Sequence, residues 1–348
     1  MMLLNSIPTV VLRGGTGVAT NLYQNLEVDP KASIDVIKAA YRALSLKFRD
    51  DEKHQKILNF ANEVLADKDK RRKYDRESNK SVGRGKKIGG YRILDKIAEG
   101  GFGTTYKAEH MATAKLVCIK HMNELSAHDH QILLDEARVC WDLRHWGIPA
   151  MRDILEMPDS SIALVMSYVP GPTLAEILQK YEDGLDPEHV AWITERTLNT
   201  LKYLHYNGVV HGDLKPQNII VQPEDHTAVL CDYGLSQVKP SSKDEARGYT
   251  PYFAAPEQMS GKVPIPETDF YGLGMTMIFA LGGDVETVKV PSHTPAGMVK
   301  FIKKLIKQQP LSRPNWQNED LCESIAAMRT EAFGRNASNM KPLKLDWS

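Results

Sequence analysis

The first eighty residues carry apolar positions at helical spacing. One stripe recurs every three or four residues, at Ile34, Ile37, Tyr41, Leu44 and Phe48. This spacing places the stripe on one face of a helix, which Ser33 would cap at its start. A second stripe lies at Ile57, Ala61, Val64 and Leu65. Two such helices, joined by residues 49–54, are expected to pack against each other as an antiparallel hairpin.

The pattern changes twice further along the chain. Residues 78–87 are polar and lack an apolar period, so a linker over residues 78–89 and a domain boundary are predicted there. After residue 90 the apolar positions alternate as in β-strands, whereas residues 187–206 again follow a helical period. The sequence contains no run of about 18 apolar residues, and it therefore predicts no membrane-spanning helix.

Composition excludes several classes of function. The chain has 348 residues, of which 42% are hydrophobic, and this suits two domains with packed cores. Its 44 Lys and Arg residues balance 44 Asp and Glu residues, so no global field favours nucleic acid or an anionic membrane. The four cysteines show no CxxC spacing and are expected to be reduced, as in a cytoplasmic protein. Residues 1–20 lack an early positive charge, contain Pro8, and are predicted to form a flexible leader rather than a signal peptide.

The densest group of chemically active residues lies in two short runs. The first reads His-Gly-Asp-Leu-Lys-Pro-Gln-Asn, from His211 to Asn218, and the second, Asp-Tyr-Gly, begins at Asp232. An acid that orients a hydroxyl group, a lysine, an asparagine and a second acid are the groups that hold Mg-ATP beside a nucleophile. The two runs match the signature set of protein kinases, and residues 90–316 resemble a eukaryotic-type protein kinase along their whole length.

The resemblance implies an α+β, bilobal protein kinase fold and a role for each residue. Asp213 would accept a hydrogen bond from the substrate hydroxyl and take its proton, and Lys215 would neutralise charge on the transferred group. Asn218 and Asp232 would hold Mg²⁺ through hard oxygen atoms. Because Ser/Thr-specific members usually carry lysine at the position of Lys215, phosphoryl transfer from ATP to serine or threonine of a protein substrate is expected.

The resemblance also implies a nucleotide site built from residues earlier in the chain. Residues 97–106 resemble the glycine-rich loop, with Ala98 in place of the first glycine, whose methyl group would narrow the approach to the ribose. Lys120 would contact the α- and β-phosphates and form an ion pair with Glu136. The other implied positions are Gly100 and Gly103 in the loop, Thr105, Cys118 and Ile220 at the faces of the base, Met166 as gatekeeper, and the backbone of Ser167 and Val169.

Gly212 stands where most kinases carry an arginine that pairs with a phosphate on the activation segment. Activation by phosphorylation of this segment, residues 235–257, is therefore not expected. Three hydroxyl residues of the segment remain candidates for autophosphorylation, namely Ser241, Ser242 and Thr250. Arg313 is predicted to form a buried ion pair with Glu257, and Asp269 is predicted to brace the catalytic loop.

The helical front of the chain resembles a J-domain, the module by which co-chaperones stimulate the seventy-kilodalton heat-shock chaperone. The resemblance covers residues 21–77 and is carried by residues 22–30, 37–42, 58–67 and 70–75. Where that family has His-Pro-Asp, this chain has Arg49, Asp50 and Asp51, so only the acid is kept. A small all-α, J-like module for docking or regulation of a protein partner is expected. A working co-chaperone and a helical spacer are the alternatives.

The end of the chain is less informative. Residues 317–348 are predicted to form one short helix and a loose tail, with a partner-binding peptide around Trp347 as the alternative. An active kinase is the leading hypothesis for function, because the base and both metal ligands are present. A pseudokinase scaffold is the rival, since Ala98, Gly212 and the altered J-like module point to relaxed constraints. A co-chaperone with a kinase-shaped appendage is the third. The protein substrate, the partner of the J-like module and the oligomeric state stay open.

Overall fold

The computed structural model describes residues 10–11, 22–28, 32–49, 51–71, 74, 84–100, 103–121, 127–156, 162–181, 183–241 and 243–345. The chain divides into two compact units, each of which is described by itself. The smaller unit consists of Arg13–Leu134 and Arg152–Met166. The larger unit consists of Asp135–Met151 and Ser167–Ser348, together with the start of the chain.

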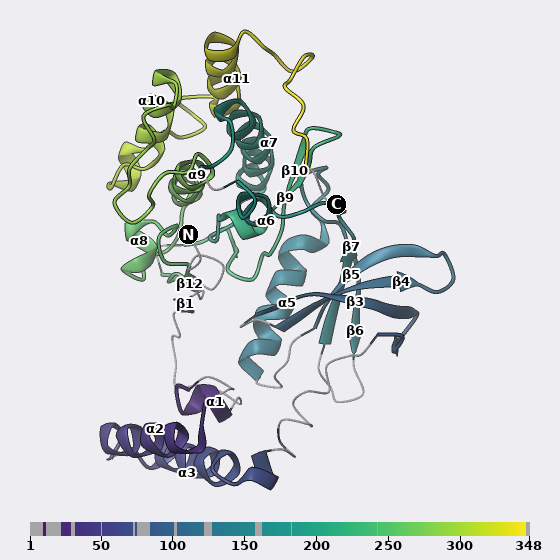
Figure 1. Cartoon of the computed structure of the whole chain (residues 1–348), viewed down its shortest axis with the longest axis vertical. Coiled ribbons are helices and arrows are strands. Elements are labelled where there is room, and N and C mark those ends of the chain that lie inside the picture. Colours follow the sequence, from purple (N-terminus) through teal and green to yellow (C-terminus); the bar gives the residue numbers. More distant parts are fainter. Residues whose placement is uncertain are drawn as a thin grey trace. The chain divides into compact units, whose positions relative to one another are not determined.

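The helical front contains α1 (Leu22–Asn25), α2 (Ile34–Lys47) and α3 (Glu52–Leu65), shown in purple and blue in Figure 1. As predicted, Ser33 caps α2, because its side chain accepts a hydrogen bond from the backbone N–H of Val36. The three helices bury a common apolar core that includes Leu26, Ile37 and Ala61. The predicted packing of two amphipathic helices is therefore confirmed.

The sheet of the smaller unit is built from six strands in the order β2-β3-β4-β5-β7-β6. These strands are β2 (Lys87–Ile88), β3 (Tyr91–Gly100), β4 (Gly103–His110), β5 (Lys115–His121), β6 (Met151–Glu156) and β7 (Ile162–Ser167). Their inward side chains, among them Ile93, Tyr106 and Ile119, form one apolar core. The helix α5 (Ala127–Trp141) lies between β5 and β6 in the sequence. Since β2 begins at Lys87, the sheet starts inside the stretch that was predicted to be linker.

The larger unit is mainly helical (Figure 1). Its helices are α6 (Leu174–Leu178), α7 (Pro187–Tyr206), α8 (Pro256–Met259), α9 (Pro266–Ala280), α10 (Ala296–Leu305) and α11 (Leu321–Phe333), with 3₁₀ turns η2 (Pro216–Asn218) and η3 (Pro310–Ser312). Its short strands are β8 (Val209–Val210), β9 (Ile219–Gln222), β10 (Thr227–Leu230), β11 (Gln237–Val238) and β12 (Gly248–Tyr249). The helix α9 is buried on nearly all sides, as expected of an apolar helix at the centre of a domain.

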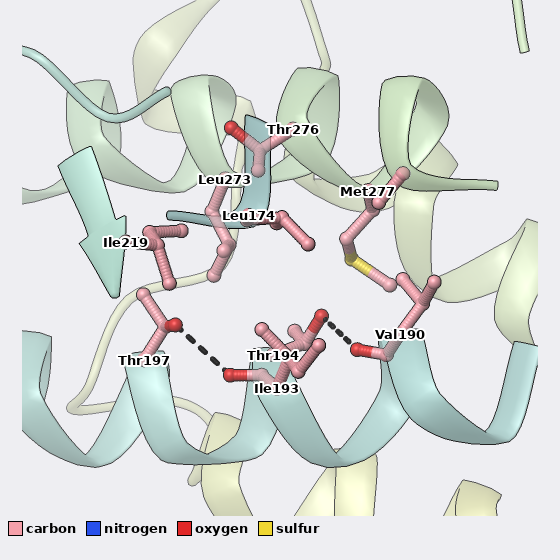
Figure 2. Close-up of a pocket in the computed structure, with 10 residues that line it drawn as sticks. Leu174, Val190, Ile193, Thr194, Thr197, Ile219, Leu273, Thr276 and Met277 are labelled. Atoms are coloured by element: carbon pink, nitrogen blue, oxygen red, sulfur yellow. Dashed lines mark hydrogen bonds between the residues drawn. The ribbon is translucent and has the colours of Figure 1, made fainter. Parts of the chain in front are cut away.

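A small apolar cavity lies between α7 and α9 (Figure 2). Thr194 and Thr197 line it, but their hydroxyl groups donate to the carbonyl oxygens of Val190 (2.7 Å) and Ile193 (2.9 Å), as the dashed lines show. The hydroxyl of Thr276 likewise donates to a carbonyl of its own helix. Because these hydroxyl groups are bonded to their own helices, the cavity is lined by apolar groups. We interpret the cavity as a packing gap rather than a ligand site.

Residues 317–345 pack into the larger unit. The guanidinium of Arg329 on α11 is buried 3.1 Å from the carboxylate of Glu195 on α7. The tail that follows α11 returns to the start of α7, where Lys341 pairs with Asp186 at 2.6 Å and Leu343 is buried. The prediction of a loose tail is therefore wrong for residues 335–345, and Trp347 lies outside the described residues.

The start of the chain also departs from its prediction. Val10 and Val11 form the strand β1, which pairs antiparallel with β12, opposite Tyr249 and Gly248 respectively. The prediction of a flexible leader is therefore wrong for Val10 and Val11. The remaining residues of the predicted leader lie outside the described part of the chain.

Candidate active site

The residues of the first signature run converge on a buried hydrogen-bonded cluster in the larger unit. The ammonium group of Lys215 lies 2.7 Å from one carboxylate oxygen of Asp213. The side-chain amide of Asn218 donates to the backbone carbonyl of Asp213 at 2.8 Å. All three side chains are at least nine-tenths buried. The predicted neighbours Asp213, Lys215 and Asn218 are therefore brought together.

Thr250 completes this cluster, and the sequence did not reveal its role. Its hydroxyl donates to the other carboxylate oxygen of Asp213 at 2.6 Å and accepts from Lys215 at 2.9 Å. Only 3% of the residue is exposed. The sequence offered Thr250 as an autophosphorylation candidate, but a phosphate in this position would face the carboxylate of Asp213 in a closed space. The sequence places Thr250 seven residues before Glu257, and this position does not by itself indicate a contact with Asp213.

Asp269 holds the backbone of the catalytic loop. At the start of α9, its two carboxylate oxygens accept the backbone N–H groups of His211 and Gly212, each at 2.8 Å. One of these oxygens also lies 2.8 Å from the imidazole Nε2 of His205. A carboxylate that accepts several hydrogen bonds fixes the donors in space. The predicted brace is therefore present.

His211 is a neutral structural residue of the loop. Its Nδ1 accepts from the backbone N–H of Asp213 at 3.2 Å, and its Nε2 lies 3.3 Å from the carbonyl of Cys231, to which it donates. The ring is completely buried, and this burial lowers its pKa below the ordinary value for histidine. His211 thus positions the backbone of Asp213 without carrying charge.

Gly212 has a conformational reason to be glycine. Its φ angle is +76°, in the left-handed region that side chains disfavour. A Cβ atom at this position would lie 3.0 Å from the backbone carbonyl oxygen of Leu235. A side chain here, such as the arginine of most kinases, would therefore strain the backbone of the loop.

Two residues of the site have oxygen atoms suited to a divalent metal. The amide nitrogen of Asn218 is used by Asp213, which leaves the side-chain oxygen of Asn218 as a ligand atom. The backbone N–H of Cys231 donates to the carbonyl of Asn218 at 2.9 Å, so Asp232 follows a residue fixed to Asn218. Asp232 has a φ angle of +64°, an uncommon conformation that is concentrated at functional sites. This donor set fits Mg²⁺, which is bound by one or two protein oxygens together with substrate phosphates.

The scaffold pair predicted from the sequence is confirmed. Arg313 donates to both carboxylate oxygens of Glu257, at 2.6 and 2.9 Å, and both side chains are buried. Such a bidentate pair fixes the end of the activation segment to the segment that carries η3.

The residues predicted to bind nucleotide are distributed over both units. In the smaller unit, Ala98 and Gly100 lie on β3, Gly103 on β4, Cys118 and Lys120 on β5, and Met166 on β7. In the larger unit, Glu136 lies on α5, Ser167 ends β7, Val169 follows it and Ile220 lies on β9. Lys120 and Glu136 are both buried. Their ion pair, and the convergence of these residues on one nucleotide, stay predictions.

The backbone N–H and the side chain of Ser167 both make hydrogen bonds within the larger unit. Its N–H donates to the carbonyl of Ala150 at 2.8 Å, and its side-chain hydroxyl accepts from the N–H of Ala150 at 2.9 Å. The N–H of Ser167 is therefore already used, and the predicted contact of its backbone with the base would have to be made by its carbonyl oxygen.

Comparison with known families agrees with this geometry. The family model of the protein kinase domain matches residues 91–286, which is more than half of the chain. The chain belongs to the protein kinase family. A model of the DnaJ domain matches residues 21–75, so the kinase domain is preceded by a DnaJ domain. The fold expected from the two resemblances is thereby confirmed.

Individual relatives are Ser/Thr kinases by name. Serine/threonine-protein kinase D of Synechocystis sp. is 30% identical over 255 residues, which cover 64% of this chain and 49% of that protein. Serine/threonine-protein kinase PAK 1 of Mus musculus is 30% identical over 68% of this chain and 41% of its own length. Serine/threonine-protein kinase ppk25 of Schizosaccharomyces pombe is 29% identical over 77% of this chain and 62% of its own length. The chain thus spans less than two thirds of each of these relatives.

Within the described residues, no helix combines the length and the apolar character needed to cross a membrane.

Proposed function

We propose that this protein transfers the γ-phosphoryl group of Mg-ATP to serine or threonine hydroxyls of a protein. The observation that carries the proposal is the buried contact of Asp213 with Lys215 and Thr250, at 2.7 and 2.6 Å. A carboxylate held in this way is oriented to accept a proton from an incoming hydroxyl. Lys215 supplies a positive charge beside it.

The residues of the chain divide the work of the transfer. When bound, Mg²⁺ would neutralise charge on the phosphates. Asn218 and Asp232 would hold the ion through their oxygen atoms, as their conformations support. Asp213 would accept the hydrogen bond of the substrate hydroxyl and then its proton. Positioning of this kind and electrostatic stabilisation provide most of the catalysis in phosphoryl transfer.

The test is transfer of radiolabelled phosphate from ATP to a general protein substrate. We expect clear labelling with the wild-type chain and a loss of at least about 10²-fold with Asp213→Asn, within the range attributed to a positioned general base. A pseudokinase scaffold, the second candidate, is supported by Ala98 at the first glycine position. Equal, background-level labelling by both proteins would refute the kinase and favour the scaffold.

We also propose that the kinase is active without phosphorylation of its activation segment. Gly212 cannot pair with a phosphate, and Ser241 is already bonded to Asp244, whose carboxylate accepts its N–H at 2.6 Å and its hydroxyl at 2.9 Å. A phosphate on Ser241 would meet this carboxylate. We expect that Ser241→Ala combined with Ser242→Ala leaves turnover nearly unchanged, and a loss above tenfold in a steady-state transfer assay would contradict this.

For the DnaJ domain we propose a docking or regulatory role. Asp51, the remnant of His-Pro-Asp, caps α3 through the N–H of His54 at 3.0 Å and pairs with the His54 ring at 2.6 Å. That ring in turn stacks on Phe48. The carboxylate is thus used within the fold. We expect that the full chain leaves the ATPase rate of a seventy-kilodalton heat-shock chaperone unchanged, and a clear stimulation would favour the co-chaperone hypothesis.

We also propose a cytoplasmic location, in keeping with the reduced state that the spacing of the four cysteines predicts.

A further inference from the structure

Gln258 connects the end of the activation segment to the catalytic loop. It lies in the first turn of α8, directly after Glu257. Its side-chain nitrogen donates to the backbone carbonyl of Gly212 at 2.8 Å, and its side-chain oxygen accepts the backbone N–H of Ala255 at 3.3 Å. Because one end of the amide must donate and the other must accept, the two bonds fix its orientation. Only 5% of the residue is exposed.

The carbonyl that Gln258 holds belongs to the residue before the catalytic aspartate. Gly212 already donates its N–H to Asp269 at 2.8 Å, so the bond from Gln258 fixes the other side of the same residue. The N–H of the same peptide group, which belongs to Asp213, donates to Nδ1 of His211 at 3.2 Å, so Gln258 supplies the shorter of the two bonds that hold this group. Glycine has no side chain to limit the rotation of the group, and its φ here is +76°. The direction in which Asp213 leaves the backbone depends on this peptide group.

We propose that Gln258 is a positioning residue for Asp213. Its uncharged amide couples the activation segment to the catalytic loop. In most kinases an arginine at the position of Gly212 makes this link by pairing with a phosphate on the segment, which glycine cannot do. This inference rests on the proposed kinase function and deepens it, because it names a built-in means by which the site stays assembled. Gln258 touches neither substrate nor nucleotide in this role, since it acts through the backbone of Gly212.

Two variants separate the hydrogen bonds from packing. Gln258→Met keeps the approximate size of the side chain and removes both bonds. Gln258→Glu keeps the acceptor for Ala255, but at pH 8 it places a carboxylate against the carbonyl of Gly212. When protonated at lower pH, this glutamate regains a donor for that carbonyl. The matched control is Gln237→Met, because Gln237 is also buried in the segment and donates to the backbone carbonyl of Glu245 at 2.6 Å.

The assay is steady-state phosphate transfer to a protein substrate, with kcat and the KM for ATP measured separately and melting temperatures recorded. With Gln258→Met we expect kcat to fall about tenfold while the KM for ATP changes less than twofold, since the lost interaction orients the base rather than the nucleotide. Gln237→Met should keep kcat within about threefold. With Gln258→Glu, the ratio of its kcat to that of the wild type should rise at least about threefold between pH 8 and pH 6, as the carboxyl group gains its proton.

Several results would overturn the proposal. It fails if Gln258→Met keeps wild-type kcat, or loses no more than Gln237→Met does. It also fails if Gln258→Glu is impaired equally at both pH values, which a purely structural role would produce. Should Gln258→Met not fold, the pH dependence of Gln258→Glu still decides. If the wild-type chain itself transfers no phosphate, the proposed kinase function is refuted. If the wild type is active and only the expected effects of the Gln258 variants are missing, the positioning role of Gln258 alone is refuted.

Discussion

Thr250 offers the sharpest test of the catalytic cluster. The change Thr250→Val keeps the shape of a side chain that is 97% buried and removes only its hydroxyl. The hydroxyl makes two bonds to charged groups, 2.6 Å to Asp213 and 2.9 Å from Lys215. A hydrogen bond to a charged group contributes about 1.5–3 kcal/mol.

The two bonds do not add in full, because Asp213 and Lys215 keep their mutual contact at 2.7 Å after the change. We therefore assign the loss of about one such bond, 1.5–3 kcal/mol, to the transition state. With about 1.4 kcal/mol for each tenfold change in rate, kcat/KM for a protein substrate should fall roughly ten- to a hundredfold. Transfer of radiolabelled phosphate measures this loss.

Two controls accompany this variant. Thr250→Ser keeps the hydroxyl and should stay within about threefold of the wild type. Thr194→Val removes an equally buried hydroxyl, which donates to the carbonyl of Val190 at 2.7 Å, and should leave kcat/KM unchanged. The reasoning is refuted if Thr250→Val retains kcat/KM within threefold. It is also refuted if mass spectrometry finds stoichiometric phosphate on Thr250 in an active enzyme.

Three further predictions concern the end of the chain. The buried Arg329 and Glu195 lie 3.1 Å apart without hydrogen-bond geometry. Either Arg329→Met or Glu195→Leu alone should lower the free energy of unfolding by about 3–5 kcal/mol, because one buried charge is left unpaired. The double change should restore or exceed wild-type stability in a double-mutant cycle measured by denaturation. Removal of residues 335–348 should lower the stability of the larger unit by about 1.5–3 kcal/mol, because a buried leucine is lost, and an unchanged melting temperature would contradict this. The hydrogen bond from Lys202 holds the pKa of Asp320 below its ordinary value. The stability that this bond contributes is therefore present at neutral pH and is lost as acid protonates Asp320. Asp320→Asn should make the melting temperature depend less on pH in the acid range.

The candidate catalytic residues could be singled out in the sequence because they occur in short runs. His211 to Asn218 lie within one loop, and their order alone identifies the acid, the lysine and the asparagine. The amphipathic helices at the front were equally accessible, since a helical period is a relation between residues three or four positions apart. The cap at Ser33 is another such local signal, and the structure confirms it.

Contacts between distant segments were not accessible in this way. Thr250 meets Asp213 across 37 positions, and Gln258 meets Gly212 across 46. A threonine or glutamine in a polar stretch has many possible partners, and the sequence pattern does not choose among them. The same holds for the tail, whose anchoring by Lys341 to Asp186 spans 155 positions and overturned the expectation of a loose end.

By itself the sequence determined the family, the order of the two domains and the identity of the groups that would perform the chemistry, because these depend on residue types at short spacing. The tertiary structure alone decided how those groups are held: which carboxylate oxygen of Asp213 meets Thr250, why residue 212 is glycine, and which side chain secures its carbonyl. The physical reason is that hydrogen bonds and burial depend on the close approach of segments that chain folding brings together, and such an approach leaves no periodic trace in the order of residues.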